Sequence, residues 1–348
     1  MIKKLSIIIF FSVIIIIVIF FILLNMQKNN ENKIQKNSEA FSVINQIEKN
    51  KIWTASFQLA WNELADYLGE NKLEFQDSES NLVNILNDRW ITKQIIDDND
   101  YYTLITDKLD GVETRITEDI KNKFGILVSI PTVDKRDNSI YIYSSIYKDC
   151  EFPEKFIELE PNIFGQSKEK VKYFGVLDGE QYKEIKQNVE VLYSDTLDNP
   201  NEYAVKIKTI DGDEVILYKT QNNGTIKEIY EDLEQKQSMN IESIELSTND
   251  KLIIPYININ TTISYEELCG KNFKNSPWYL TDAKQAIYLK INETGVQLQN
   301  NSSIEGTVLS SPREFNFNDR FVLFMKEKDQ NKPYLGIIID DTKVLEKE

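Results

Sequence analysis

A run of apolar, uncharged residues occupies positions 5–24, LSIIIFFSVIIIIVIFFILL. Such a run, about twenty residues long, matches the hydrocarbon core of a bilayer, so we predict a transmembrane signal anchor there. A cleaved signal peptide is the alternative, but NMQKNNENK follows the run and contains no small-x-small cleavage site. Lys3 and Lys4 precede it, which favours a cytoplasmic N-terminus at residues 1–4 and a single-pass protein of the cell membrane with its C-terminal domain outside.

Helical spacing of apolar residues begins after a polar stretch. Residues 25–50 are rich in Asn, Lys and Gln and are typical of a solvated tether. ASFQLAWNELADYL then carries apolar side chains at helical spacing, at Phe57, Trp61, Leu64 and Leu68. SNLVNILNDRWITKQII and ETRITEDIKNKFG continue helical patterns between about residues 70 and 125. We therefore predict that the domain begins with helices.

From about residue 138 the apolar period changes to two. Short runs rich in β-branched and aromatic residues follow: SIYIYSSIY, KVKYFGVL, NVEVLYS, YAVKIKTI, EVILYKT, KLIIPYI and QAIYLKI. Asp211 and Gly212 supply a hairpin turn between two of them, and TQNNGTIKEIYEDLEQ leads into a short helix. Helices first and strands later predict one α+β domain with large antiparallel sheets over residues 51–348.

Composition limits the partners. The formal charge is -16 and the sequence pI is near 4.7, without a basic stripe, so we expect no binding to nucleic acid phosphates. The richness in Lys, Asn and Ile is typical of a low-GC bacterial protein. The membrane contact that we expect is made by the N-terminal helix alone.

The chain contains no histidine. This excludes Ser-His-Asp and Cys-His nucleophile activation and most zinc sites. Cys150 and Cys269 form no CxxC pair, and one disulfide or two free thiols remain alternatives. Asp97, Asp98 and Asp100 lack the spaced ligands of a calcium loop and indicate a solvated turn. We expect no cofactor and no metal.

Several segments of the second half carry motifs in a fixed order. SSIYKDCEFPEKF is similar to a strand that ends in an AIYFKGxWxxPF-like motif, with matches at Ile146, Tyr147, Lys148 and Phe156. KLIIPYININTTISYEEL is similar to a PKFxIxxxYxL segment, with matches at Pro255, Ile257, Tyr265 and Leu268. FNFNDRFVLF and YLGIII are similar to the closing strands of the same family. In this order the segments resemble the serpins.

The long stretch NETGVQLQNNSSIEGTVLSSPREF carries the strongest resemblance. Glu293, Thr294 and Gly295 match the E-x-G hinge that precedes the family's exposed reactive-centre loop. The resemblance thus implies a reactive loop at about residues 293–316. Two features depart from the family: the buried SPxS motif is not found, and Arg320 stands where a loop-closing proline belongs. Residues 69–137 are too short and too different to align, which implies a serpin-like fold with a reduced N-terminal helical layer.

The resemblance implies a suicide inhibitor of proteases and not an enzyme. In such a protein the cut loop enters a sheet as a new strand and traps the acylated protease. Counting from Gly295 puts the bait bond at Leu309–Ser310, with Val308 before it. Leucine suits a serine or cysteine protease with an apolar specificity pocket, and we expect the inhibitor to be a monomer.

A strand that enters a sheet must send alternate side chains into the core. Every second residue from Val296 to Val308 lies on one face of such a strand. Most residues of this face are apolar or small: Val296, Leu298, Asn300, Ser302, Ile304, Gly306 and Val308. The intervening positions are all polar. This pattern favours a strand that can insert.

Two alternatives remain open. Val296 and Leu298 follow the hinge glycine where inhibitory members carry small residues, and this bulk can slow insertion until the protease escapes. The protein would then be a non-inhibitory serpin-fold binding or structural surface protein. The other alternative is an enzyme that uses Asp340 and Asp341, but adjacent residues of a strand point to opposite faces, which disfavours acid and base work on one substrate.

Overall fold

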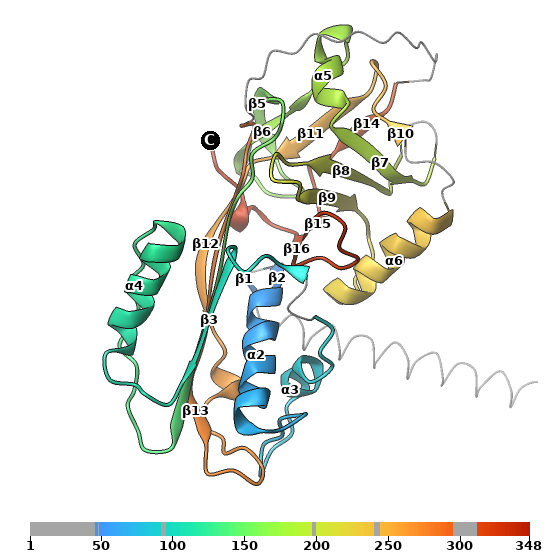
Figure 1. Ribbon diagram of the computed structural model, residues 1–348. Coiled ribbons are helices and arrows are strands. Elements are labelled where there is room, and N and C mark those ends of the chain that lie inside the picture. Colours follow the sequence, from blue (N-terminus) through green and yellow to red (C-terminus); the bar gives the residue numbers. More distant parts are fainter. Residues whose placement is uncertain (1–45, 48, 92–94, 197–199, 240–243, 295–311) are drawn as a thin grey trace, which may run out of the picture.

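The computed structural model describes residues 46–47, 49–91, 95–196, 200–239, 244–294 and 312–348 (Figure 1). Within these ranges, no helix combines the length and the apolar character that a membrane crossing requires. The predicted membrane segment at 5–24, nearly all of the predicted tether, and residues 295–311 of the reactive loop lie outside the described residues.

The described helices are α2 (Ala55–Leu68), α3 (Asn81–Leu86), α4 (Val112–Phe124), α5 (Lys183–Lys186) and α6 (Ile226–Met239), with short 3-10 turns at Glu180–Tyr182, Glu266–Leu268 and Thr342–Val344. The helix predicted at 55–68 is confirmed, and Phe57, Trp61 and Leu64 are buried on one side of it. Helix α2 ends at Gly69, whose φ of 72° is a left-handed conformation that glycine adopts without steric cost.

An eight-stranded sheet forms the largest layer, in the order β1-β2-β16-β15-β9-β8-β7-β10. All its pairs are antiparallel. Its strands are β1 (Gln46–Ile47), β2 (Asn50–Thr54), β16 (Leu335–Ile339), β15 (Phe321–Lys326), β9 (Glu214–Lys219), β8 (Tyr203–Lys208), β7 (Val189–Ser194) and β10 (Ile244–Glu245). The predicted hairpin between β8 and β9 is confirmed, with Gly212 at a φ of 92° in its turn.

Two four-stranded sheets complete the fold. One has the order β14-β11-β6-β5, with β14 (Glu314–Asn316), β11 (Lys251–Pro255), β6 (Lys170–Val176) and β5 (Ile157–Ile163). The other has the order β12-β13-β4-β3, with β12 (Ile257–Ser264), β13 (Tyr279–Ile291), β4 (Ser139–Asp149) and β3 (Tyr101–Thr106). Figure 1 shows this long second sheet between α4 on one side and α2 with α3 on the other. The α+β prediction is confirmed, but the expectation of antiparallel sheets holds only for the eight-stranded one: each four-stranded sheet contains one parallel pair, β11 with β14 and β4 with β13.

The predicted run SNLVNILNDRWITKQII is α-helical only over Asn81–Leu86 among its described residues, and between the two predicted helical runs the segment YYTLIT forms a strand. This segment is β3, which pairs antiparallel to β4 from Tyr101 opposite Ile146 to Thr106 opposite Tyr141. Its aromatic and β-branched residues suit a pleated surface, and pairing with β4 outweighs the weak helical pattern of the flanking sequence. The later helix predicted at ETRITEDIKNKFG is confirmed as α4.

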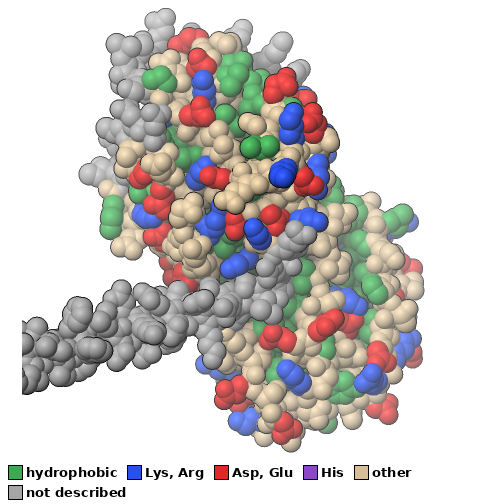
Figure 2. Space-filling model, turned by 180° about the vertical axis from the view of Figure 1, so that it is seen from behind, with side chains coloured by type: hydrophobic (Ala, Val, Ile, Leu, Met, Phe, Trp, Pro, Cys, Tyr) green, Lys and Arg blue, Asp and Glu red, His purple; other side chains and the backbone are tan. Residues whose placement is uncertain are grey.

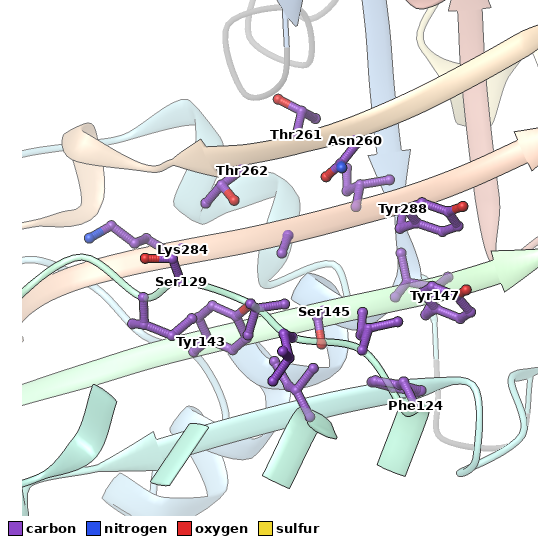
Figure 3. A pocket seen from close by; sticks show the side chains of 18 of the residues that line it. Phe124, Ser129, Tyr143, Ser145, Tyr147, Asn260, Thr261, Thr262, Lys284 and Tyr288 are labelled. Atoms are coloured by element: carbon purple, nitrogen blue, oxygen red, sulfur yellow. The ribbon is translucent and has the colours of Figure 1, made fainter. Parts of the chain in front are cut away.

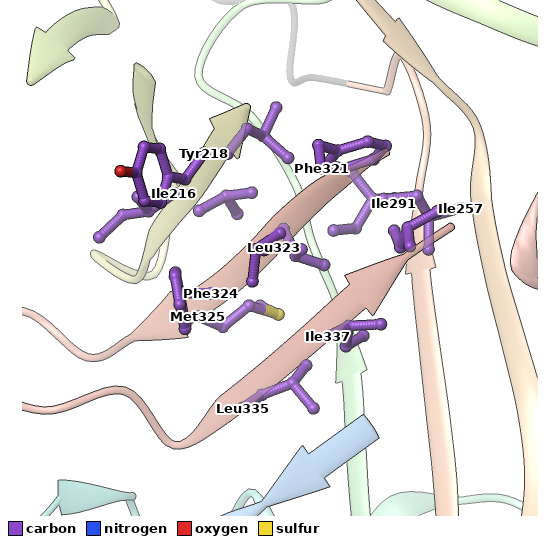
Figure 4. Packing of buried hydrophobic residues seen from close by; sticks show 14 of the residues in the cluster. Ile216, Tyr218, Ile257, Ile291, Phe321, Leu323, Phe324, Met325, Leu335 and Ile337 are labelled. Carbon is purple, nitrogen blue, oxygen red and sulfur yellow. The ribbon is translucent and has the colours of Figure 1, made fainter. Parts of the chain in front are cut away.

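The main hydrophobic core is formed by the eight-stranded sheet, the β14-β11-β6-β5 sheet and the ends of β12 and β13. Figure 4 shows Leu323 and Ile337 of the eight-stranded sheet packed near Ile257 and Ile291. Strands β15 and β16 are buried almost throughout, which explains why FVLFM and LGIII are continuous apolar runs rather than alternating ones.

Both cysteines are free thiols, so of the two alternatives the structure has two unpaired cysteines and not a disulfide. Burial raises the pKa of the Cys150 thiol, and it raises that of Cys269 to about 11, which keeps both groups protonated at neutral pH.

Acidic and basic side chains are interspersed over the described part of the face in Figure 2. This distribution agrees with the absence of a basic stripe in the sequence.

Candidate functional site

The centre of the second four-stranded sheet is a parallel pair of strands, β4 and β13. The pairing runs from Ser139 opposite Tyr279 to Asp149 opposite Lys290. The other two pairs of this sheet, β3 with β4 and β12 with β13, are antiparallel. We name the boundary between β4 and β13 the seam. A strand placed in the seam antiparallel to both neighbours would replace one parallel ladder with two antiparallel ladders, which are slightly more stable per residue.

The predicted reactive loop begins just after the end of β13, at residue 293. Backbone N–H groups of Phe152 and Phe156 donate to the carbonyl oxygens of Thr294 and Glu293, at 3.2 and 3.0 Å. The Glu293 carboxylate lies 3.5 Å from the Lys155 ammonium. Burial opposes ionisation of Glu293, but a hydrogen bond from Tyr256 and the charge of Lys155 hold its pKa below the ordinary value. The proximal end of the loop is therefore fixed next to the seam.

The same end of β4 is held by a buried charge cluster. The Lys148 ammonium lies 2.5 Å from Asp100 and 2.7 Å from Asp213, in the turn between β8 and β9. Tyr334 donates to Asp213 at 2.6 Å. Burial disfavours the Lys148 charge, but hydrogen bonds to the two carboxylates raise its pKa above the ordinary value. These contacts tie the end of the seam to the eight-stranded sheet.

The distal end of the loop is fixed in a different sheet. Arg313 donates to Asp250 through Nη2 at 2.6 Å and through its backbone N–H at 3.0 Å. Arg313 is 7% exposed and Asp250 is 0% exposed. Strand β14 then pairs parallel to β11, with Leu252 opposite Phe315. Because its two ends belong to different sheets, an intact loop cannot enter the seam fully unless β14 separates from β11.

A buried polar cluster lies beneath the seam. Gln285 of β13 is 0% exposed, accepts from the Tyr265 hydroxyl at 2.7 Å, and donates to the hydroxyls of Thr54 and Ser56. Gln285 stands opposite Ser144 of β4. Thr54 and Ser56 flank the start of α2 and supply two buried hydroxyls even though the SPxS pattern is absent. Opening the seam separates β13 from β4 at this cluster.

We expect the substitution Gln285→Leu to lower the free energy of unfolding by about 1–3 kcal/mol, because it removes the acceptor of Tyr265 and the donor to Thr54 and Ser56. Denaturant unfolding measures the change. Gln76→Leu is the control, because Gln76 is exposed and surface substitutions usually alter stability by less than about 0.5 kcal/mol. Equal stability of the two variants would contradict a role for the cluster.

The structure describes only part of the predicted site. Glu293 is in place at the end of β13, beside Lys155. Gly295, Val296, Leu298 and the bait residues Val308, Leu309 and Ser310 lie outside the described residues. Sequence reasoning missed the Arg313–Asp250 contact and the contacts of Gln285 with Thr54 and Ser56, because these partners lie 63 or more positions away along the chain. An arginine directly after Ser-Ser-Pro at the end of the loop was the only signal for the first of them.

One member of the alternative carboxylate pair, Asp341, has a structural role. Asp341 accepts from the backbone of Lys49 at 2.8 Å, from the Asn50 amide at 2.5 Å and from the backbone of Lys343 at 2.9 Å. These contacts fix the turn after β16. Across the described residues, no cluster of three or more Cys, Asp or Glu side chains could hold a metal ion.

Arg320, which replaces the expected proline, fixes the turn between β14 and β15. Its guanidinium donates to the backbone oxygens of Thr220 and Asn222, at 2.7 Å for the second. Arg320 thus supplies by hydrogen bonding the rigidity that a proline would supply through its ring.

Comparisons with known proteins identify the architecture. No protein-family model matches the chain, and no curated protein does. Several solved structures do match the chain. The chain is similar to maspin, with 11% identity, a TM-score of 0.58, and coverage of 88% of this chain and 98% of that one. A structure described as a tumour suppressing serpin has 12% identity, a TM-score of 0.53, and coverage of 88% and 99%. Native protease nexin-1 with heparin has 11% identity, a TM-score of 0.54, and coverage of 88% and 95%.

Proposed function

We propose, from the premise that this chain has the serpin fold, that it is a protease inhibitor whose cut loop inserts into the seam. The observation that carries the proposal is the parallel pairing of β4 with β13, from whose end the loop continues. A chain that turns back after Thr294 runs antiparallel to both strands. Val296–Val308 has 13 residues, which equals the length of β13.

The alternation in the loop fits this role. Both faces of β4 are buried from Ser139 to Ile146, with one face against α2 and the other beneath α4. A strand beside β4 must therefore bury side chains on at least one face. Val296, Leu298, Ile304 and Val308 share one face of such a strand. The polar residues between them share the other.

The proposed bait bond is Leu309–Ser310, and the proposed targets are serine or cysteine proteases with apolar specificity pockets. The protease supplies the chemistry: its nucleophile attacks the Leu309 carbonyl carbon, and the bond to the Ser310 nitrogen breaks. Glu293 and Gly295 act as the hinge. We also propose a monomer that acts outside the membrane, anchored through residues 5–24, whose length suits a bilayer.

Mixing the protein with chymotrypsin or subtilisin tests the proposal. We expect a band at the summed mass on a denaturing gel, because the acyl bond survives denaturation. The variant Leu309→Asp removes the apolar residue that the protease recognises. The intensity of its adduct band should therefore be at least about tenfold lower, which corresponds to a loss of ~1.4 kcal/mol in the free energy of protease binding. Met239→Asp is the matched control, because Met239 is 68% exposed at the end of α6.

The alternative function is a non-inhibitory surface protein with the same fold. The bulk of Val296 and Leu298 favours it, since bulky side chains slow the entry of a strand. Cleavage between 296 and 312 without any adduct would support this alternative and contradict inhibition.

A further inference from the structure

A cavity of about 440 Å³ lies on the seam, on the face of the sheet that packs beneath α4. Its floor is formed by β4, β13 and β12, and its roof by the end of α4 and residues 126–131 (Figure 3). Ser145 opposite Ala286 and Tyr147 opposite Tyr288 form the middle of the floor. The volume falls within the roughly 300–1,000 Å³ that is usual for small-molecule sites.

One side of the cavity is aromatic. The rings of Tyr147 and Tyr288 stack with centroids 4.6 Å apart and an angle of 9° between their planes. Phe124 of α4 stacks on Tyr147 at 5.9 Å. The roof adds aliphatic side chains, and Leu127 beside it is 78% exposed. Because Tyr147 is stacked on both Tyr288 and Phe124, this stack offers mainly ring edges to the cavity, and ring edges beside aliphatic side chains favour a flat aromatic ligand.

The floor also holds an unsatisfied polar group. Ser145 is 6% exposed, and its Oγ has no hydrogen-bond partner among the described residues. A buried hydroxyl without a partner costs free energy, so a ligand that bonds to Ser145 is favoured. Lys284 also lines the cavity, but its ammonium group is already ion-paired with Asp282. A neutral ligand therefore suits the cavity better than a charged one.

We propose that this cavity binds a flat, neutral aromatic molecule of two or three fused rings that carries one hydroxyl group. The hydroxyl bonds to Ser145 Oγ, and the rings pack against Tyr147, Tyr288 and the roof. Such a molecule contacts both strands of the seam and binds the closed sheet in preference to an opened one. It therefore slows loop insertion, a consequence that rests on the proposed function.

Calorimetric titration of the full-length protein with 2-naphthol tests the binding. We expect one saturable site, which Ser145→Ala weakens about 3- to 10-fold because one hydrogen bond is lost. Ser144→Ala is the matched control: its hydroxyl is also buried without a partner among the described residues, but it points to the opposite face and should leave binding unchanged. Ala286→Phe fills the cavity and should abolish binding.

Failure to bind, or equal binding by the Ser145→Ala, Ser144→Ala and wild-type proteins, would overturn the proposal. The consequence for insertion is tested by the rate at which the thermal stability of the protein rises after the loop is cut, measured with and without 2-naphthol. An unchanged rate overturns the regulatory role. If the cut protein shows no insertion even without 2-naphthol, the proposed function and the regulatory role both fail, while the binding result stands by itself.

Discussion

A single cut at the proposed bait bond, Leu309–Ser310, should raise the thermal unfolding midpoint of the protein by about 10 °C or more, at ~2–4 °C per kcal/mol for a domain of this size. The cut frees the proximal part of the loop from the anchor at Arg313. That part then enters the seam and buries four aliphatic side chains, each worth about 1.5–3 kcal/mol before the opposing conformational entropy. Calorimetry of the intact and the chymotrypsin-cut protein measures the difference.

Two double variants with matched charge separate insertion from other effects of the cut. Leu298→Asp with Ile304→Asp puts carboxylates on the apolar face of the inserting strand, so the cut protein should gain no stability, since unpaired buried charges are costly. Gln297→Asp with Gln299→Asp puts the same charges on the polar face, beside the end of β4 that is not fully buried, and should keep most of the gain. An equal gain in both double variants would show that stabilisation does not depend on the alternation.

Replacing Arg313 with methionine should lower the free energy of unfolding by about 3–5 kcal/mol, because it leaves a buried carboxylate without its partner. Asp250 is 0% exposed, and both of its oxygens accept from the Arg313 side chain. Methionine is a long, uncharged side chain, so the variant removes the guanidinium, which also lies over the Phe315 ring at 5.2 Å from its centroid, and the loss reports mainly on the charge. Chemical denaturation measures it.

The control is Arg89→Met, which breaks a more exposed ion pair with Asp66 at 3.3 Å. Exposed pairs contribute at most about 1 kcal/mol, so this variant should remain close to wild type. A loss for Arg313→Met no greater than that for Arg89→Met would mean that the distal anchor does not depend on the ion pair. The ion pair would then not explain why the intact loop stays outside the sheet.

Local patterns in the sequence were sufficient for much of the fold. The helical period predicted α2, and the period of two predicted β4 and most of β13. The periodicity of the sequence could not predict β3, because six residues of mixed burial carry little periodicity and the strand exists through its pairing with β4. Nor could it show that β4 and β13 are parallel neighbours, since about 140 residues separate paired positions such as Ser145 and Ala286.

The candidate site divides in the same way. A local motif predicted a hinge at Glu293, a residue that the structure places two positions after the end of β13 and beside Lys155. The anchor at Asp250 and the cluster around Gln285 depend on residues brought together by the tertiary structure, and no short motif contains them. The resemblance to serpins supplied the order of the segments, while the contacts that hold the loop at each end came from the structure.

Hydrogen exchange of residues 296–308, before and after the loop is cut, tests the central claim most directly. Insertion places the backbone amides of this segment in ladders with β4 and β13, so we expect strong protection to arise only in the cut protein. Amides of β4 and β13 should stay protected in both forms. Unprotected amides at 296–308 in the cut protein would contradict insertion into the seam.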